Sequence, residues 1–368
     1  MTFTNGMGDD HRPYRFYGAE ISYFSAKVRP ALRYKGLRYA ELTPDYQNVI
    51  LPRTGLAFIP ILVTPEDETL QDTSDILDAL ETRVPTPPLY PASPIQRVVA
   101  FLWELYADEF MLLPAMHYRW DFPESERRIL GDFFVMTGDT KAASNFAGRM
   151  KGSLPFLGVT PETAPAIEAH TTELLALLSA HFSAQNYLLG ERMSLADCAL
   201  MGPLYAHLYL DATPGLILRE TAPQVCLWIQ RMNHPEPEAP GAWLANDALG
   251  ATHRPLLELI GRDAVPVILD AVRAFESWAD GRDTGTDEPP RGVGEHGTAL
   301  RGIPMTRYTS SYTSWMLQRV LDAYGALPDE ERTTVDRALA ATGCDTLLRY
   351  SPRHRLEKRG FKLAFAGD

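Results

Sequence analysis

The segment YRFYGAEISYFSAKVRPALRYKGLRYAEL, residues 14–42, contains one complete β-α-β pattern. Residues 14–17 have the composition of a strand, and the apolar residues of 25–35 recur at helical spacing before a stop at Gly36. Residues 39–42 then return to a strand pattern. Two strands joined by a crossover helix predict a sheet domain of the α/β class.

The residues that follow extend this unit into a first domain at 14–84. Two apolar runs, 58–63 and 69–70, flank the polar turn 64–68, which predicts a short hairpin. A helix is expected to begin at Asp72, because apolar residues then recur at helical spacing. The predicted order is strand, helix, strand, loop or short helix, strand, strand, helix.

A proline-rich connector, 83–94, ends the first domain, because its five prolines sustain neither a helix nor a strand. Helical periodicity then predicts an all-α second domain at 95–234. Its expected helices are 95–118, 124–150, 161–182, 194–208 and 223–232.

The last region, 235–368, is predicted to be a mainly helical C-terminal extension. Helical patterns occur at 244–279 and near 315–324, and the segment between them, 280–304, is rich in Gly, Asp and Pro. A basic run at 349–362 stands out in an acidic chain and is expected to pack against acidic neighbours, with a site for an anion or a partner as the alternative.

Composition narrows the class of protein. The 368 residues carry a net charge of −12, which disfavours broad binding to nucleic acid or to anionic membranes. The three cysteines are far apart, so neither a disulfide framework nor a zinc site is indicated, and we expect no metal. There is no signal peptide pattern and no apolar run of about 18 residues, which predicts a cytoplasmic protein without a membrane span.

Three hydroxyl side chains lie around the start of the first helix, at Ser22, Tyr23 and Ser25. A helix N-terminus exposes unpaired N–H groups and a partial positive charge, and a hydroxyl there can donate to a thiolate. Both effects favour the ionised form of a bound thiol, and lowering its pKa by about two units requires roughly 2.7 kcal/mol. The alternative is that Ser22 or Ser25 only caps the helix.

Pro60 begins an apolar strand, where the missing N–H is unfavourable unless the local turn is special. A cis bond after Ile59 explains such a proline and turns neighbouring backbone groups outward, where they can pair with an extended peptide-like ligand. Only about 5 to 6% of X-Pro bonds in folded proteins are cis, so a trans proline is the competing interpretation.

Asp72 and Thr73 stand where the last helix of the first domain begins. One interpretation is that they cap this helix. The other is that they hold the amino-acid head group of a ligand, with Thr73 and the helix N–H groups on its carboxylate and Asp72 on its ammonium.

Taken in this order, these features resemble the thioredoxin-like N-terminal domain of glutathione transferases. The resemblance implies that Ser22 activates the glutathione thiol. It also implies that Ile59 with Pro60 binds the cysteinyl backbone, and that Asp72 with Thr73 forms the γ-glutamyl site.

The sequence departs from the family pattern after Ser22, where serine-type members commonly have proline and this chain has Tyr23. Because of this departure, Ser22, Tyr23 and Ser25 all remain candidates for the group that activates the thiol. Tyr17 is a weaker candidate. No cysteine precedes Cys198, so thiol exchange cannot start from this loop and any reactive sulfur must arrive with the ligand.

The second domain contains LLGERMSLAD at 188–197, which closely resembles the helix-six capping box of the same family. Ser194 is the expected N-cap and Asp197 the reciprocal acceptor, so their role is in folding. Replacing Asp197 is expected to cost about 0.5 to 2 kcal/mol. The resemblance covers roughly 14–232, and the extension has no counterpart in ordinary members.

Family members place a co-substrate pocket between the two domains, walled by the first long helix of the second. The candidates from that helix for substrate binding are Tyr106, His117, Tyr118 and Arg119. Aromatic residues at helical spacing are more often core than ligand wall, and a lone His117 is more often a cap than an acid or base.

The resemblance implies an enzyme that uses glutathione as co-substrate against a small electrophilic substrate and that assembles as a homodimer. A non-catalytic binding or assembly module with the same fold is the alternative, and the length of the extension favours it. A metaxin-like import component is a weaker possibility, because the sequence contains no anchor.

Overall fold

The N-terminal region is built on a four-stranded mixed sheet with the order β2-β1-β3-β4. The computed structural model describes residues 12–282 and 288–367. The elements of this region are β1 (Tyr14–Tyr17), α1 (Tyr23–Tyr34), β2 (Tyr39–Leu42), η1 (Tyr46–Ile50, a π-helical turn), α2 (Leu51–Thr54), β3 (Ile61–Val63), β4 (Thr69–Gln71) and α3 (Thr73–Arg83). The predicted order of elements is confirmed, including the short helix before β3.

The predicted apolar face of α1 is part of the core. Val28, Ala31 and Leu32 are fully buried. The helix begins two residues earlier than predicted, because Ser22 is its N-cap and the Ser22 Oγ accepts a hydrogen bond from the Ser25 N–H at 3.3 Å. β1 pairs in parallel with β2 and antiparallel with β3, so the first loop and the start of β3 meet at one end of the sheet.

The second region is all-helical, as predicted. One expected helix, 124–150, is divided in two at Gly138, whose φ of 66° ends α6. The elements are α4 (Pro94–Leu105), η2 (Tyr106–Phe110), α5 (Leu112–Trp120), α6 (Pro123–Thr137), α7 (Thr140–Gly152), α8 (Leu154–Leu157), α9 (Ala164–Ala184), α10 (Leu195–Met201), η3 (Gly202–Tyr209), α11 (Ala212–Thr221) and α12 (Pro223–Asn233).

The extension is mainly helical but also contains two β-hairpins. The segment 280–304, which is rich in Gly, Asp and Pro, holds β5 and the start of β6 in its described part. The elements are η4 (Ala245–Asp247), α13 (His253–Leu259), η5 (Ile260–Ala264), α14 (Val265–Ala279), β5 (Gly292–Leu300), β6 (Ile303–Ser310), α15 (Ser311–Gly325), α16 (Asp329–Leu339), α17 (Asp345–Leu348), β7 (Leu356–Arg359) and β8 (Lys362–Phe365).

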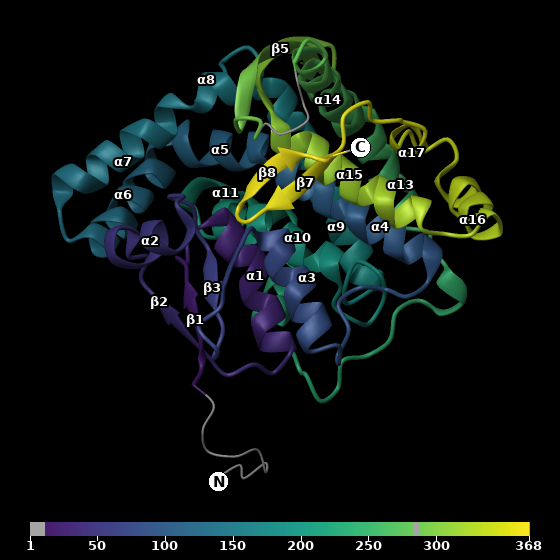
Figure 1. Ribbon diagram of the computed structural model, residues 1–368, viewed down its shortest axis with the longest axis horizontal. Helices are drawn as coiled ribbons and strands as arrows, with labels where there is room; N and C mark the ends of the chain where they lie inside the picture. The colour runs from purple at the N-terminus through teal and green to yellow at the C-terminus, as the bar shows by residue number, and fades with distance from the viewer. Residues whose placement is uncertain (1–11, 283–287, 368) are drawn as a thin grey trace.

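The extension packs directly on the first two regions (Figure 1), and α15 and α16 lie against α4. The largest hydrophobic core continues through all three regions without a break. The Asp247 carboxylate also caps α4, accepting hydrogen bonds from the N–H groups of Ile95 at 2.7 Å and Gln96 at 2.9 Å. The extension is thus structurally integrated with the helices that it covers.

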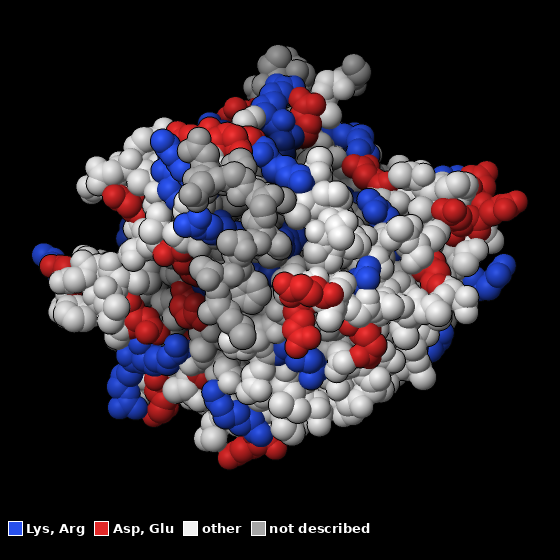
Figure 2. All heavy atoms as spheres, turned by 90° about the horizontal axis from the view of Figure 1, so that it is seen from below, with Lys and Arg blue, Asp and Glu red and all other residues white. Residues whose placement is uncertain are grey.

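Charged side chains of both signs are interspersed with neutral ones on the face drawn in Figure 2. The basic run at 349–362 is paired with acidic neighbours, as predicted; for example, Arg353 and Arg355 bind Asp280 and Asp322. Within 12–282 and 288–367, no helix is both long and apolar enough to cross a membrane.

Candidate functional site

A cavity of about 90 Å³ lies where the first loop of the sheet domain, α3, the α4–η2 helix and the extension meet. We call this cavity the cleft. Its wall is formed by Phe24, Leu56, Phe58, Ile59, Pro60, Gln71, Asp72, Thr73, Asp108, Glu109, Arg291, Tyr312 and Met316. All four of the residues expected to bind glutathione are therefore on one cavity wall.

The peptide bond between Ile59 and Pro60 is cis, as the position of the proline suggested. Neither the N–H nor the C=O of Ile59 takes part in a backbone hydrogen bond with another described residue. An unpaired donor and acceptor beside a cavity can pair with the backbone of an extended ligand.

The N-terminus of α3 forms the neighbouring part of the wall. Asp72 is the N-cap, and its Oδ1 accepts a hydrogen bond from the Ser74 N–H at 3.0 Å. Its φ of 75° is unusual for a residue with a side chain, and such backbone strain is concentrated at functional sites. The helix end adds unpaired N–H groups and a partial positive charge that suit a carboxylate.

The candidate hydroxyl residues differ in how far they are buried. The Ser25 side chain is buried and its Oγ accepts from the Ala19 N–H at 3.2 Å. The buried Tyr23 hydroxyl donates to the Ala107 carbonyl at 2.5 Å, and burial raises its pKa well above the usual value. Tyr17 packs in an apolar cluster with Ile61. These three groups are held within the fold.

Ser22 is the remaining candidate, and it is partly exposed. Its Oγ accepts one hydrogen bond as the cap of α1, and no acceptor for its hydroxyl hydrogen occurs among the described residues. The side chain therefore combines the capping role with a free donor at a helix N-terminus. Phe24, and not Ser22, supplies the part of the cleft wall that comes from this loop.

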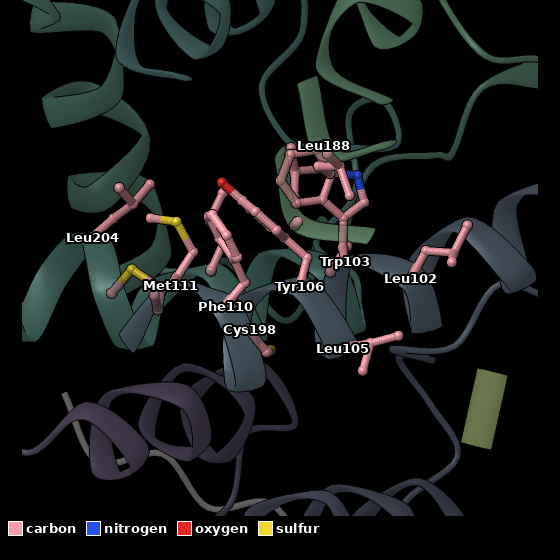
Figure 3. Close-up of a cluster of buried hydrophobic side chains, with 14 of the residues drawn as sticks. Leu102, Trp103, Leu105, Tyr106, Phe110, Met111, Leu188, Cys198 and Leu204 are labelled. Atoms are coloured by element: carbon pink, nitrogen blue, oxygen red, sulfur yellow. The ribbon is translucent and has the colours of Figure 1, made fainter. Parts of the chain in front are cut away.

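Tyr106, expected in the co-substrate wall, instead belongs to the core. Figure 3 shows it beside Trp103 and Phe110 within a cluster of buried apolar side chains. Its hydroxyl lies 2.7 Å from His170 Nε2, and His170 Nδ1 lies 2.8 Å from Asp263 Oδ2. This buried chain of hydrogen bonds connects the second region to the extension.

The other three candidates on this helix also lie outside the cleft wall. The buried His117 ring is bonded to Asp121 and Glu168. Tyr118 lines a separate small cavity beside α9 and α11. Arg119 pairs with Asp211 at 2.8 Å and donates to the Ile21 carbonyl at 3.0 Å, so it braces the loop that leads to Ser22.

Two acidic residues, Asp108 and Glu109, form the wall on the α4–η2 side, and the sequence interpretation missed both. Asp108 Oδ2 binds Lys27 Nζ at 2.5 Å, whereas its Oδ1 is buried and has no partner among the described residues. Burial raises the pKa of Asp108 to about 7 against the opposing effect of Lys27. Asp108 could have been noticed in the sequence, because it is an acidic residue within a helix of mostly apolar and aromatic residues.

Lys27 is the centre of a buried charge cluster beneath the cleft. It binds Glu104 Oε1 at 2.8 Å as well as Asp108. Burial alone raises the pKa of Glu104, but Arg319 and Lys27 lower it to about 2. Arg319, from α15, also binds Asp78 on α3 at 2.6 Å. The cluster thus ties α1, α3, α4 and the extension together.

The extension supplies the outer wall of the cleft through Arg291, Tyr312 and Met316. The Arg291 guanidinium lies 4.7 Å from the ring centre of Phe58 and 4.2 Å from that of Tyr312, within the range of cation–π contacts. The Thr313 hydroxyl donates to Glu109 at 2.6 Å. No local sequence signal could place these residues beside Ile59.

Fold and cleft together define a protein with a thioredoxin-like domain, a helical domain and a cavity where they meet. Family models agree with this description. The model for the glutathione S-transferase N-terminal domain matches residues 16–88, and that for the glutathione S-transferase C-terminal domain matches 148–236. The chain belongs to the glutathione transferase superfamily, with an extension beyond residue 236.

Several solved structures are similar to the chain. One is a glutathione S-transferase from Rhodospirillum rubrum F11, with 18% identity over 65% of this chain and 96% of that chain and a TM-score of 0.43. Another is beta-etherase LigF from Sphingobium sp. strain SYK-6, with 19% identity over 61% of this chain and 97% of that chain and a TM-score of 0.46. No curated protein matches the chain.

Proposed function

We propose that this protein binds glutathione in the cleft and activates its thiol for attack on a small electrophilic organic substrate. The observation that carries the proposal is the shared wall of Ile59, Pro60, Asp72 and Thr73. This wall offers an open backbone donor and acceptor beside a helix N-terminus with an acidic cap, which matches a peptide that carries a carboxylate and an ammonium.

Ser22 is the group that we assign to the thiol. Its free hydroxyl hydrogen donates to the thiolate sulfur, and the N-terminus of α1 favours the negative charge. The sulfur then forms a bond to an electrophilic carbon, and where the substrate carries a leaving group, that group departs with its bonding electron pair. The product is a thioether, and where the leaving group is a halide, the same step removes the halogen from the substrate.

Asp72→Ala is expected to weaken glutathione binding at least about tenfold, since it removes the acceptor for the ligand's ammonium. Calorimetric titration of the full-length protein measures this change. Asp45→Ala is the matched control, because Asp45 also caps a helical turn of the sheet domain but lies outside the cleft wall. Absence of glutathione binding to the wild type at millimolar concentrations would contradict the proposal.

Ser22→Ala is expected to lower kcat with a generic electrophile roughly 10- to 100-fold, because loss of one to two units of thiol pKa lowering costs about 1.4 to 2.7 kcal/mol. The rate profile should move to higher pH, where the unassisted thiol ionises. Tyr23→Phe is the control, since the Tyr23 hydroxyl is held by the Ala107 carbonyl, and its rate should not change. Full activity of Ser22→Ala would exclude Ser22 as the activating group.

A non-catalytic binding module is the second candidate, and one observation favours it. The cleft of about 90 Å³ is smaller than the roughly 300 to 1,000 Å³ of typical ligand pockets, and residues of the extension form part of its wall. Under this alternative, glutathione binds without turnover of any electrophile, and Ser22→Ala has no effect on binding. A homodimer remains a prediction from the resemblance, and a cytoplasmic location remains a prediction from the sequence, which has no signal peptide pattern and no long apolar run.

A further inference from the structure

The C-terminal hairpin places a lysine on the acidic residues that begin α3. β7 and β8 pair in antiparallel fashion, and Lys358 lies on β7. Its Nζ is 2.9 Å from Asp72 Oδ2 and 3.2 Å from Asp75 Oδ2. It also donates to the Tyr312 hydroxyl at 3.2 Å. The side chains of Lys358 and Asp72 are only 15% and 16% exposed, so this contact is largely shielded from water.

This contact has the chemistry expected of a bound amino-acid ligand. An alkylammonium group donates to the same carboxylate that the proposed function assigns to the ammonium of glutathione. The bond to Lys358 occupies Asp72 Oδ2, and Ser74 already occupies Oδ1. A ligand ammonium that binds Asp72 Oδ2 in this way competes with the Lys358 Nζ for the same oxygen.

Two hydrogen bonds hold the hairpin on α15: the Gln318 side-chain amide donates to the Leu356 carbonyl at 2.8 Å and accepts from the Leu356 N–H at 2.9 Å. Among the described residues, the strands of the hairpin pair as a sheet only with each other, and Leu356, Leu363 and Phe365 belong to a small apolar cluster separate from the main core. A two-stranded hairpin has marginal stability by itself, and such units open locally at a lower free-energy cost than core helices. In contrast, α15 is fixed by Leu317 in the main core and by Arg319, which pairs with the buried Glu104.

We infer that the hairpin 356–365 is an internal occupant of the γ-glutamyl subsite, with Lys358 in the place of the ligand's ammonium. This inference rests on the proposed function. Glutathione binds after the hairpin has moved away from Asp72, so its apparent affinity is reduced by the fraction of molecules in which the hairpin is closed. The extension thereby sets the concentration of glutathione at which the cleft fills.

Lys358→Met tests the inference, because methionine keeps an apolar stem beside Tyr312 and removes only the ammonium. We expect calorimetric titration of the full-length variant to give glutathione binding at least about tenfold tighter than in the wild type. Lys362→Met is the matched control. It lies in the same hairpin but pairs with Glu288 at the surface, and its affinity for glutathione should equal that of the wild type.

Hydrogen exchange of the wild-type protein supplies a second test that needs no variant. Saturating glutathione is expected to accelerate amide exchange in residues 356–365, because binding displaces the hairpin. The amides of β5 and β6, which also form a hairpin of the extension, should be unaffected.

The outcomes separate the inference from the proposed function. Equal glutathione affinity of Lys358→Met and wild type, together with unchanged exchange in 356–365, would overturn the inference and leave the proposed function standing. Absence of glutathione binding to wild type, Lys358→Met and Lys362→Met alike would overturn the proposed function and the inference with it. Tighter binding by Lys358→Met alone supports both.

Discussion

Replacing Asp197 by alanine is expected to lower the free energy of unfolding by about 3 to 5 kcal/mol, because several buried donors lose their acceptor together. The carboxylate is fully buried and accepts hydrogen bonds from the N–H groups of Leu188 and Ser194, at 2.8 and 2.9 Å. It also accepts from the Ser194 hydroxyl at 2.7 Å and from the Trp228 indole N–H at 3.1 Å. The capping box predicted from the sequence is confirmed, but the residue does more than cap a helix.

Chemical denaturation measures this loss as a lower midpoint at an unchanged slope. Asp139→Ala is the matched control. Asp139 is an exposed N-cap whose side chain accepts one hydrogen bond, from the Ala142 N–H at 2.7 Å. Its loss should cost only about 0.5 to 2 kcal/mol. If both substitutions lower the free energy of unfolding by the same small amount, Asp197 acts only as a helix cap.

Lys27→Met is expected to destabilise the protein by about 3 to 5 kcal/mol at neutral pH, because it leaves Glu104 and Asp108 buried without their shared cation. Lys151→Met serves as the control. Lys151 forms an exposed pair with Glu126, and such pairs contribute about 0 to 1 kcal/mol. Denaturation at several pH values measures both variants.

The loss of folding stability in Lys27→Met should increase as the pH rises. Without the lysine, the pKa values of Glu104 and Asp108 in the folded state rise, so the folded state binds more protons than the unfolded state. Stability then falls as pH increases from the unfolded pKa of the carboxyls, about 4, through their raised folded values. The variant should accordingly be closest to wild type in mild acid. A deficit that grows below pH 5 would contradict this account.

The sheet domain was predictable because its signals are local. Strands of 14–17 and 39–42 and the helix between them are each encoded within a few residues, and the positions of Pro60 and Asp72 follow from the same short-range pattern. Helix boundaries were less predictable. Gly138 divides an otherwise continuous periodic segment, and only its positive φ reveals that the chain turns there.

One wall of the candidate site could be predicted from the sequence and the opposite wall could not, for a related reason. The residues expected to bind glutathione are close in sequence to the motifs that identify them, whereas the opposite wall comes from Arg291, Tyr312 and Met316. Their position depends on tertiary packing over a long sequence separation, which a single sequence does not encode in any local pattern. The basic run containing Lys358 was expected to meet acidic neighbours, but which acids it meets required the structure.

The cap that Asp247 places on α4 has a consequence for how the chain is made. The bond joins residues 152 positions apart, and Arg319 reaches Asp78 across 241 positions. A chain that leaves the ribosome from its N-terminus cannot form either contact until most of its length has been synthesised. Contacts of such long range also slow folding. The helices α3 and α4 are therefore expected to gain these contacts only after the corresponding parts of the extension have emerged.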